Sequence, residues 1–339
     1  MSDAGFCIDL NDKFTRVCDI TQKGPKVELD TVGYAETAPL FFSQERNKVI
    51  EDQALVLTNL VTNLRIKKKL VHIVIPDTYA FSQIVEMPKL KEKELLAAIR
   101  YQADEFIPMD IDETSIDLEI LREDPVAKKL LILIVASPKK IIEKIEKVCE
   151  AAHLIPDSLE TEISAAGRLF TSILSLKGSK SVVINFGYYT TTLYLVDPES
   201  SLIIFSRTFK IGLDLFVKDM RANLSWEDKK IYEALKSIGF TQNASVDLGK
   251  LFAPIMKEFA NELQKFLVLA RDHYNISIEQ LFIYNADTYI NQLNQALTTS
   301  ISLPVGALPI QNYLLPTPAT TAFQTELSSL VSGIGGDLQ

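Results

Sequence analysis

Two stretches of the chain, residues 5–76 and 181–308, repeat one order of strands and helices. In each stretch, three β-branched and apolar segments are separated by short polar turns, and helix and then strand follow. Sequence similarity between the two stretches is weak, so the repeat is one of element order rather than of residues. This order predicts an α/β chain with two lobes of duplicated design. The first three segments of each lobe are residues 5–10, 14–22 and 26–36, and residues 181–187, 191–197 and 202–212.

The composition allows two medium-sized cores and disfavours several classes of function. The 339 residues are 47% apolar, and single domains usually hold about 100–200 residues. A net charge of −9 and a pI near 5.1 argue against a nucleic-acid binder, which needs clustered Lys and Arg to neutralise phosphates. No signal peptide opens the chain and no run of 18 apolar residues occurs. Membrane association is therefore expected only through a partner.

The residue types that often carry catalysis or metal binding are scattered. No C-x-x-C pair, nucleophile elbow or phosphate-binding glycine motif of the Walker or dinucleotide type occurs. We therefore expect buried thiols in a reducing cytosol, no metal site and no catalytic residue. The cysteines and histidines concerned are Cys7, Cys18, Cys149, His72, His153 and His273.

A small α+β unit interrupts the first lobe. A helix between Pro88 and Pro108, strands at 116–123 and 127–137, and a helix beginning at Ser137-Pro138 follow one another, and residues 153–170 resume the lobe as a strand and a helix. The predicted boundaries are 1–88 and 155–180 for the first lobe, 89–154 for the inserted unit, and 181–339 for the second lobe, with a helical subdomain at about 223–275.

The helix between the two prolines carries a specific phrase as well as an amphipathic period. Leu95, Ile99, Ala103 and Phe106 share one face. The wording around them resembles the signature of PilM, the actin-like protein of type IV pilus assembly. The resemblance implies a two-lobed actin-like (ribonuclease H-like) α/β fold, with the inserted subdomain that PilM shares with FtsA. The matching positions are Glu86, Met87, Pro88, Glu94, Leu95, Ile99, Arg100, Tyr101, Ala103, Glu105, Ile107 and Pro108.

The resemblance also locates a nucleotide cleft, and the residues there are altered. Actin-like ATPases hold phosphates between two D-x-G-x-x-x-T turns, one in each lobe. In the first turn Asp9 is kept, but Asn11 and Asp12 replace Gly and Ser, with Lys13 following. A carboxylate about 4 Å from a phosphate oxygen would be repelled by roughly 4 kcal/mol at an effective dielectric of 20. We therefore expect a hairpin turn without phosphate chemistry.

The second turn and the adenosine-binding strand end are altered too. In the second turn Gly187 and Thr190 match, Asn185 replaces the acid, and Tyr188 adds bulk. A neutral amide neither accepts a proton from water nor serves Mg²⁺ well. At the third place, where the family has two glycines, this chain has Asn285 and Ala286. The sequence therefore predicts a vestigial cleft, no expected cofactor, and little or no binding or hydrolysis of ATP.

The resemblance implies a scaffold function at the inner face of the cytoplasmic membrane. PilM-like proteins bind the N-terminal cytoplasmic tail of the bitopic protein PilN in a groove between the first lobe and the inserted subdomain, and meet other platform and motor proteins. The alternatives are an ATP-binding, FtsA-like or filament-forming protein, and a cytoplasmic component of a type II secretion platform. Six residues near the subdomain junction are predicted to line the groove: Tyr79, Phe81, Ile84, Glu86, Leu96 and Arg100.

Overall fold

The computed structural model describes residues 5–101, 107, 109–242 and 246–338. The chain divides into two compact units, and we describe each by itself. Unit 1 comprises the residues up to Thr21, Leu29–Arg168, and the residues from Ser332. Unit 2 comprises Gln22–Glu28 and Leu169–Val331.

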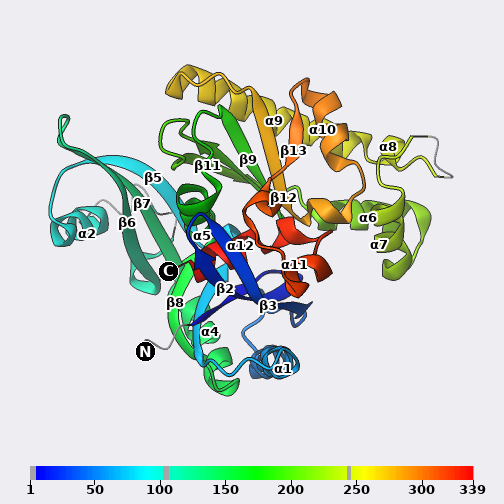
Figure 1. The fold of residues 1–339 in the computed structure, drawn as a ribbon, viewed down its shortest axis with the longest axis horizontal. Coiled ribbons are helices and arrows are strands. Elements are labelled where there is room, and N and C mark those ends of the chain that lie inside the picture. The colour runs from blue at the N-terminus through cyan, green and yellow to red at the C-terminus, as the bar shows by residue number, and fades with distance from the viewer. Residues whose placement is uncertain (1–4, 102–106, 108, 243–245, 339) are drawn as a thin grey trace. The chain divides into compact units, whose positions relative to one another are not determined.

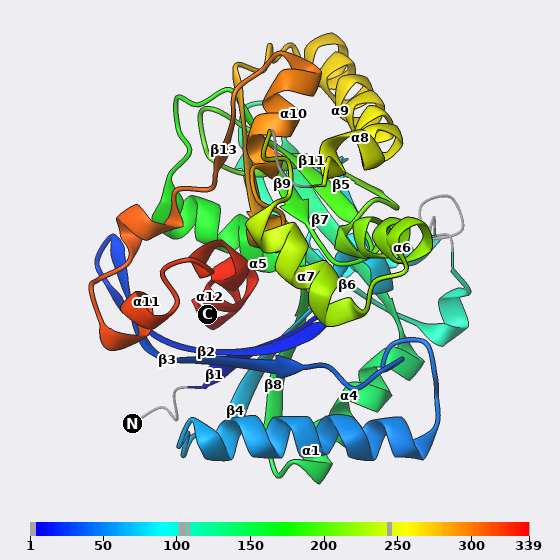
Figure 2. The same cartoon turned by 90° about the vertical axis from the view of Figure 1, so that its right-hand side faces the viewer.

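Unit 1 is built on a five-stranded sheet of order β3-β2-β1-β4-β8. Strand β1 pairs antiparallel with β2 and parallel with β4, and β4 pairs parallel with β8. Alternate residues of β1 point to opposite faces of the sheet. One face packs on α1 and α4, and α12 lies against the other (Figure 2). The elements are β1 Phe6–Leu10, β2 Phe14–Lys23, β3 Lys26–Glu36, α1 Asn47–Asn63, β4 Leu70–Ile75, η1 Asp77–Tyr79, α4 Lys139–Ala151, β8 Ile155–Thr161, α5 Glu162–Leu169 and α12 Val331–Asp337.

Unit 2 repeats the same strand order in its own sheet, β11-β10-β9-β12-β13. Strands β9 and β10 are buried along their whole length, and α9 covers them with a row of apolar residues at three- and four-residue spacing. The two units therefore share a duplicated design, as the repeated order of elements along the chain predicts. The elements are η3 Phe170–Leu174, β9 Ser181–Phe186, β10 Thr191–Val196, β11 Ile203–Phe209, α6 Leu213–Leu224, α7 Asp228–Ser237, α8 Leu248–Leu251, α9 Ala253–Tyr274, β12 Gln280–Asn285, η4 Ala286–Tyr289, α10 Leu293–Ile301, β13 Val305–Ala307, η5 Ile310–Tyr313, α11 Pro318–Ala322 and η6 Leu327–Leu330.

A second, three-stranded sheet of order β5-β7-β6 belongs to unit 1 (Figure 1). Its elements are β5 Phe81–Pro88, α2 Glu92–Tyr101, η2 Ile111–Glu113, β6 Thr114–Asp124 and β7 Lys129–Pro138. Leu95 and Ile99 of α2 are fully buried in its core, as the amphipathic period predicts. Ala103 and Phe106, which the same period places on this face, lie outside the described residues.

The packing departs from the predicted domain boundaries in several places. The small sheet begins at Phe81 rather than after Pro88, because β5 pairs with β7 along its length. Helix α4, expected in the inserted unit, buries Ile145 and Val148 in the core of the five-stranded sheet. Residues 169–180 pack with unit 2, and the residues from Ser332 pack with unit 1. An amphipathic period shows that a helix has an apolar face, but not which sheet receives it.

Candidate functional site

The retained acid of the first turn, Asp9, forms an ion pair with a residue of the neighbouring strand. Asp9 and Arg16 face each other across the β1–β2 pair, with 3.1 Å between Asp9 Oδ2 and Arg16 Nη1. Both side chains are buried, at 1% and 4% exposure. Burial raises the pKa of Asp9 even though Arg16 lowers it. Asp9 is therefore held within the protein by its own counter-ion.

The substituted residues of the same turn are engaged as well. Asn11 Nδ2 donates to Glu162 Oε1 of α5 at 3.1 Å, and Tyr79 Oη donates to Asp12 Oδ1 at 2.5 Å. Lys13 Nζ lies 3.0 Å from Glu36 Oε1. Asp12 and the buried Glu162 together place two carboxylates at this turn. The predicted residues of the first turn are thus brought together, in an arrangement that an incoming anion would have to displace.

The second turn is closed by backbone hydrogen bonds. Gly187 N donates to Thr190 O at 2.9 Å, and a Cβ on Gly187 would lie 2.8 Å from that oxygen, so the turn requires glycine. The first amides of α6, from Leu213 and Asp214, donate to the carbonyls of Gly187 and Tyr188 at 3.1 and 2.9 Å. Free amides at a helix start are the usual cradle for an anion. These two amides are already satisfied by the turn itself.

The altered residues of the second turn and the third place form one network in unit 2. Asn285 Nδ2 donates to Asn185 Oδ1 at 2.9 Å, and Asn185 Nδ2 donates to Tyr194 Oη at 3.4 Å. Asn185, Asn285 and Ala286 are all buried. Asn285 adopts φ +84°, in the left-handed region that normally favours glycine. Asn185 and Asn285, the altered residues of two places 100 residues apart in sequence, therefore contact each other in the core.

Next to this network lies a buried carboxyl, Asp287. Burial raises its pKa to about 7, although the Ser328 hydroxyl donates to Asp287 Oδ1 at 2.9 Å. Its ordinary pKa is 3.8. Between these two values the folded chain holds a proton that the unfolded chain releases. The contribution of Asp287 to the free energy of unfolding therefore falls as the pH rises through this window and stays low above it.

Replacing Asp287 with asparagine removes this titration. We compare the melting temperature of Asp287→Asn minus that of the parent chain at two pH values. We expect this difference to be more positive at about pH 8.5 than at about pH 5, because only the parent has an ionised buried carboxylate at the higher pH. Thermal unfolding of both proteins at both pH values measures the difference, and every other titrating group cancels. An equal difference at the two pH values would show that Asp287 does not titrate in this range.

The first three residues predicted to bind a partner do not share a surface. Tyr79 stacks on Phe42 with ring centroids 4.1 Å apart, and its hydroxyl binds Asp12. Phe81 packs into the core under α2, whereas Ile84 has the opposite parity on β5 and therefore faces the other side of the sheet. These side chains thus have separate surroundings.

The remaining three residues lie on the rim of the small sheet and on its helix. Glu86 pairs with Lys129 of the neighbouring strand at 3.0 Å. Leu96 is half-buried and Arg100 is exposed on α2, whose buried residues cover one face of the small sheet. The six predicted residues therefore do not converge on one pocket, and their role stays a prediction.

A groove in unit 1 instead runs between the edges of two sheets. It has a volume of about 460 Å³. Strand β6 ends the small sheet and β8 ends the five-stranded sheet, and each strand contributes consecutive residues to the lining. Because alternate residues of a strand point to opposite faces, a consecutive lining means that the backbone edges border the groove. The lining residues are Asp117, Leu118, Glu119, Val135, Ser158, Leu159, Glu160, Thr161, Ser164 and Arg168.

The groove is acidic at its β6 edge and neutralised at its α5 wall. The Arg168 guanidinium donates two hydrogen bonds, of 2.9 and 2.7 Å, to the Glu160 carboxylate. Asp117 and Glu119 project from the same face of β6, because they are two residues apart. Partial desolvation in the groove raises the pKa of Glu119, although Arg168 lowers it. The lining therefore carries an excess of negative charge.

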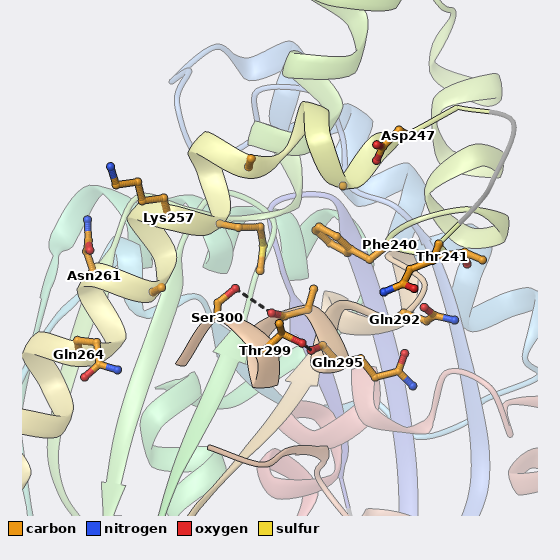
Figure 3. Close-up of a pocket in the computed structure, with 16 residues that line it drawn as sticks. Phe240, Thr241, Asp247, Lys257, Asn261, Gln264, Gln292, Gln295, Thr299 and Ser300 are labelled. Atoms are coloured by element: carbon orange, nitrogen blue, oxygen red, sulfur yellow. Dashed lines mark hydrogen bonds between the residues drawn. The ribbon is translucent and has the colours of Figure 1, made fainter. Parts of the chain in front are cut away.

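A larger cavity, of about 1050 Å³, lies in unit 2 between α9 and α10 (Figure 3). Its lining includes the apolar side chains of Phe240 and Met256, and the hydroxyls of Thr299 and Ser300 donate to carbonyls of their own helix. No strand contributes to the lining described for this cavity. Its walls carry several carboxamides, namely Gln242, Asn261, Gln264, Gln292 and Gln295. It therefore has no backbone edge that an extended chain could pair with.

The arrangement of the strands is shared with solved structures. The structure described as "PilM-PilN type IV pilus biogenesis complex" matches with a TM-score of 0.83 at 16% identity, covering 99% of this chain and 98% of that one. MreB 5 of Spiroplasma citri bound to AMPPNP matches with a TM-score of 0.52 at 11% identity, over 97% and 93%. The ethanolamine utilization protein EutJ from Carboxydothermus hydrogenoformans gives 0.52 at 11%, over 98% and 89%.

These matches and the duplicated sheets define an actin-like α/β protein. The family described as type IV pilus assembly protein PilM matches residues 8–314. The chain belongs to this family. In the part of the chain that the structure describes, no helix is long and apolar enough to cross a bilayer, and no three His, Cys, Asp or Glu side chains are grouped to hold a metal ion.

The groove residues were not among those predicted from the sequence. A signal for them exists in β6, where Ser115, Asp117 and Glu119 alternate with the apolar Ile116 and Leu118. This alternation shows that one face of the strand does not enter a core. It does not show that β8, some 40 residues later, borders the same space. That juxtaposition needs the fold.

Proposed function

We propose that this chain is a scaffold of type IV pilus assembly that binds the extended N-terminal tail of a PilN-like membrane protein in the groove between β6 and β8. The observation that carries the proposal is that two edge strands, β6 and β8, border one groove. An extended peptide can add to such an edge through main-chain hydrogen bonds, while side chains enter flanking pockets. One of the similar structures reported above is described as a PilM-PilN complex, which supports this choice of partner.

The dimensions of the groove fit a short segment of extended chain. The four residues Ser158–Thr161 of β8 border it, and at about 3.3 Å per residue they offer a pairing edge of about 13 Å. The apolar part of the lining consists of Leu118, Val135 and Leu159. Its negative charge includes Asp117 and Glu119. A tail with alternating apolar residues and a cationic side chain suits this lining. Membrane association and a place at the cytoplasmic face would then come through the partner.

A synthetic peptide of the partner's tail tests the proposal directly. We expect saturable binding by calorimetry with a Kd below about 100 μM, which corresponds to more than about 5.5 kcal/mol. The same peptide with its residues in scrambled order is the control. No detectable binding of the native peptide at this concentration would reject the proposal.

The same scaffold is proposed to work without ATP hydrolysis. Support comes from the first turn, where Asp9 is paired with Arg16 and Asp12 adds a second carboxylate bound to Tyr79. It also comes from the second turn, where the Asn185 amide stands in place of an acid and the first α6 amides are satisfied by the turn. A non-enzymatic role is therefore favoured over that of an ATP-dependent filament former.

Calorimetry with nucleotide tests this second statement. We expect no saturable heat at about 1 mM ATP with Mg²⁺, so that any affinity is weaker than about 4 kcal/mol. The peptide titration on the same sample serves as the positive control. A saturable heat that requires both ATP and Mg²⁺ would show that the altered turns still hold a nucleotide.

A further inference from the structure

One arginine belongs to both the groove and the C-terminal helix. Arg168 lines the groove and holds Glu160, another lining residue. Its Nη1 atom also donates to the carbonyl oxygen of Gly335 in α12 at 2.8 Å. A guanidinium has its donors in a fixed planar fork, so the position of one acceptor constrains the others. The docked position of α12 thus helps to fix the orientation of the Arg168 side chain in the groove.

Helix α12 can pack in this position only because the residues that contact its neighbours are glycines. A Cβ on Gly335 would collide with the carbonyl oxygen of Ala165 in α5. A Cβ on Gly336 would lie 2.6 Å from Cys7 Sγ and from Val74 Cγ2 of the sheet. Beyond these contacts, Asp337 Oδ2 accepts a hydrogen bond from Ile20 N of β2 at 2.8 Å. The helix is therefore docked by close backbone contact with α5 and the sheet.

The chain reaches α12 directly from unit 2. Unit 2 ends at Val331 and unit 1 resumes at Ser332, so α12 begins at the passage between them. Ile334 of α12 is fully buried, whereas the residues that line the groove lie on β6, β7, β8 and α5. Helix α12 therefore acts on the groove through the lining residues that it approaches: Arg168, which donates to Gly335, and Glu160, which lies close to Gly336.

We propose that docking of α12 and occupation of the groove are coupled through Arg168, so that a bound tail stabilises docked α12 and docked α12 tightens binding of the tail. This inference rests on the proposed function, since it concerns the same groove. Coupling of this kind is reciprocal: whatever factor α12 docking adds to peptide affinity, peptide binding adds to α12 docking. Typical couplings change affinity by about five- to 150-fold.

The variant Gly333→Ala tests the coupling without a new contact to the lining of the groove. Its new methyl group would meet Cys18 Sγ of β2, whereas Gly306→Ala adds the same group at a position in β13 with no atom within 4 Å. We expect Gly333→Ala to weaken binding of the tail peptide about five- to 150-fold, with Gly306→Ala within about twofold of the parent. Equal affinity in both variants, with both folded by circular dichroism, would overturn the coupling.

Hydrogen exchange on the parent chain gives a second readout that needs no variant. Addition of the peptide should slow amide exchange in residues 331–337, none of which lines the groove; unchanged exchange there would refute the coupling. If the parent binds no peptide, the proposed function fails by itself. The coupling is then read without peptide, as faster exchange at 158–168 in Gly333→Ala than in Gly306→Ala, and equal rates would reject it.

Discussion

Replacing Ser164 with tryptophan is expected to weaken binding of the partner's tail by at least about 100-fold, or about 2.7 kcal/mol. Ser164 lies on α5 and lines the groove beside Thr161. An indole ring placed there occupies space that the peptide needs, and it cannot reproduce the lost contacts. Calorimetry with the tail peptide measures the effect, and the melting temperature of the variant shows that the fold is intact.

The matched control is Ser300→Trp, which puts the same ring into the larger cavity of unit 2. Ser300 is exposed on α10 and lines that cavity. We expect its peptide affinity to stay within about twofold of the parent chain. The reverse result, with binding lost in Ser300→Trp and kept in Ser164→Trp, would move the tail site to unit 2. This pair of variants therefore decides between the two cavities.

Replacing Arg16 with methionine is expected to lower the free energy of unfolding by about 3–5 kcal/mol, the usual cost of breaking a buried ion pair from one side. Arg16 and Asp9 are 4% and 1% exposed, so Asp9 would be left buried without its counter-ion. The pKa of Asp9 is already raised by burial and would rise further. Urea unfolding at neutral pH measures the loss.

The double variant Asp9→Asn with Arg16→Met supplies the control. Because both charges are gone, no unpaired carboxylate remains, and we expect most of the lost stability to return. If the double variant is as unstable as Arg16→Met alone, the loss comes from packing of the arginine side chain rather than from the stranded charge. The interpretation of Asp9 as a residue committed to a structural pair would then need revision.

The order of strands along the chain could be predicted because each strand carries its own signal. Continuous apolar, β-branched runs such as 70–75 and 181–186 indicate buried strands, whichever sheet they join. The destinations of α4 and α12 could not be predicted in this way. Amphipathicity shows that α4 has an apolar face, while the glycines of α12 gain their meaning only from Cys7, Val74 and Ala165, which lie far away in sequence.

The altered residues of the two turns could be read from the sequence, but their contacts and the groove could not. The substitutions at Asn11 and Asn185 are visible in the sequence, and they point to an altered cleft. That Asn185 contacts Asn285, and that Arg16 neutralises Asp9, depends on strand register. The six predicted partner-binding residues were chosen by closeness in sequence to one junction, whereas the groove draws its lining from four elements. Register and the packing of separate sheets are long-range properties that a local pattern does not contain.

Photo-crosslinking tests the central claim, that an extended tail lies between β6 and β8, most directly. A tail peptide with a photoreactive residue at its centre is bound to the full chain, irradiated, and mapped by mass spectrometry. We expect cross-links on Asp117–Glu119, on Ser158–Thr161 and on α5, the elements that border the groove. Cross-links confined to α2, or to α9 and α10 of unit 2, would contradict the claim.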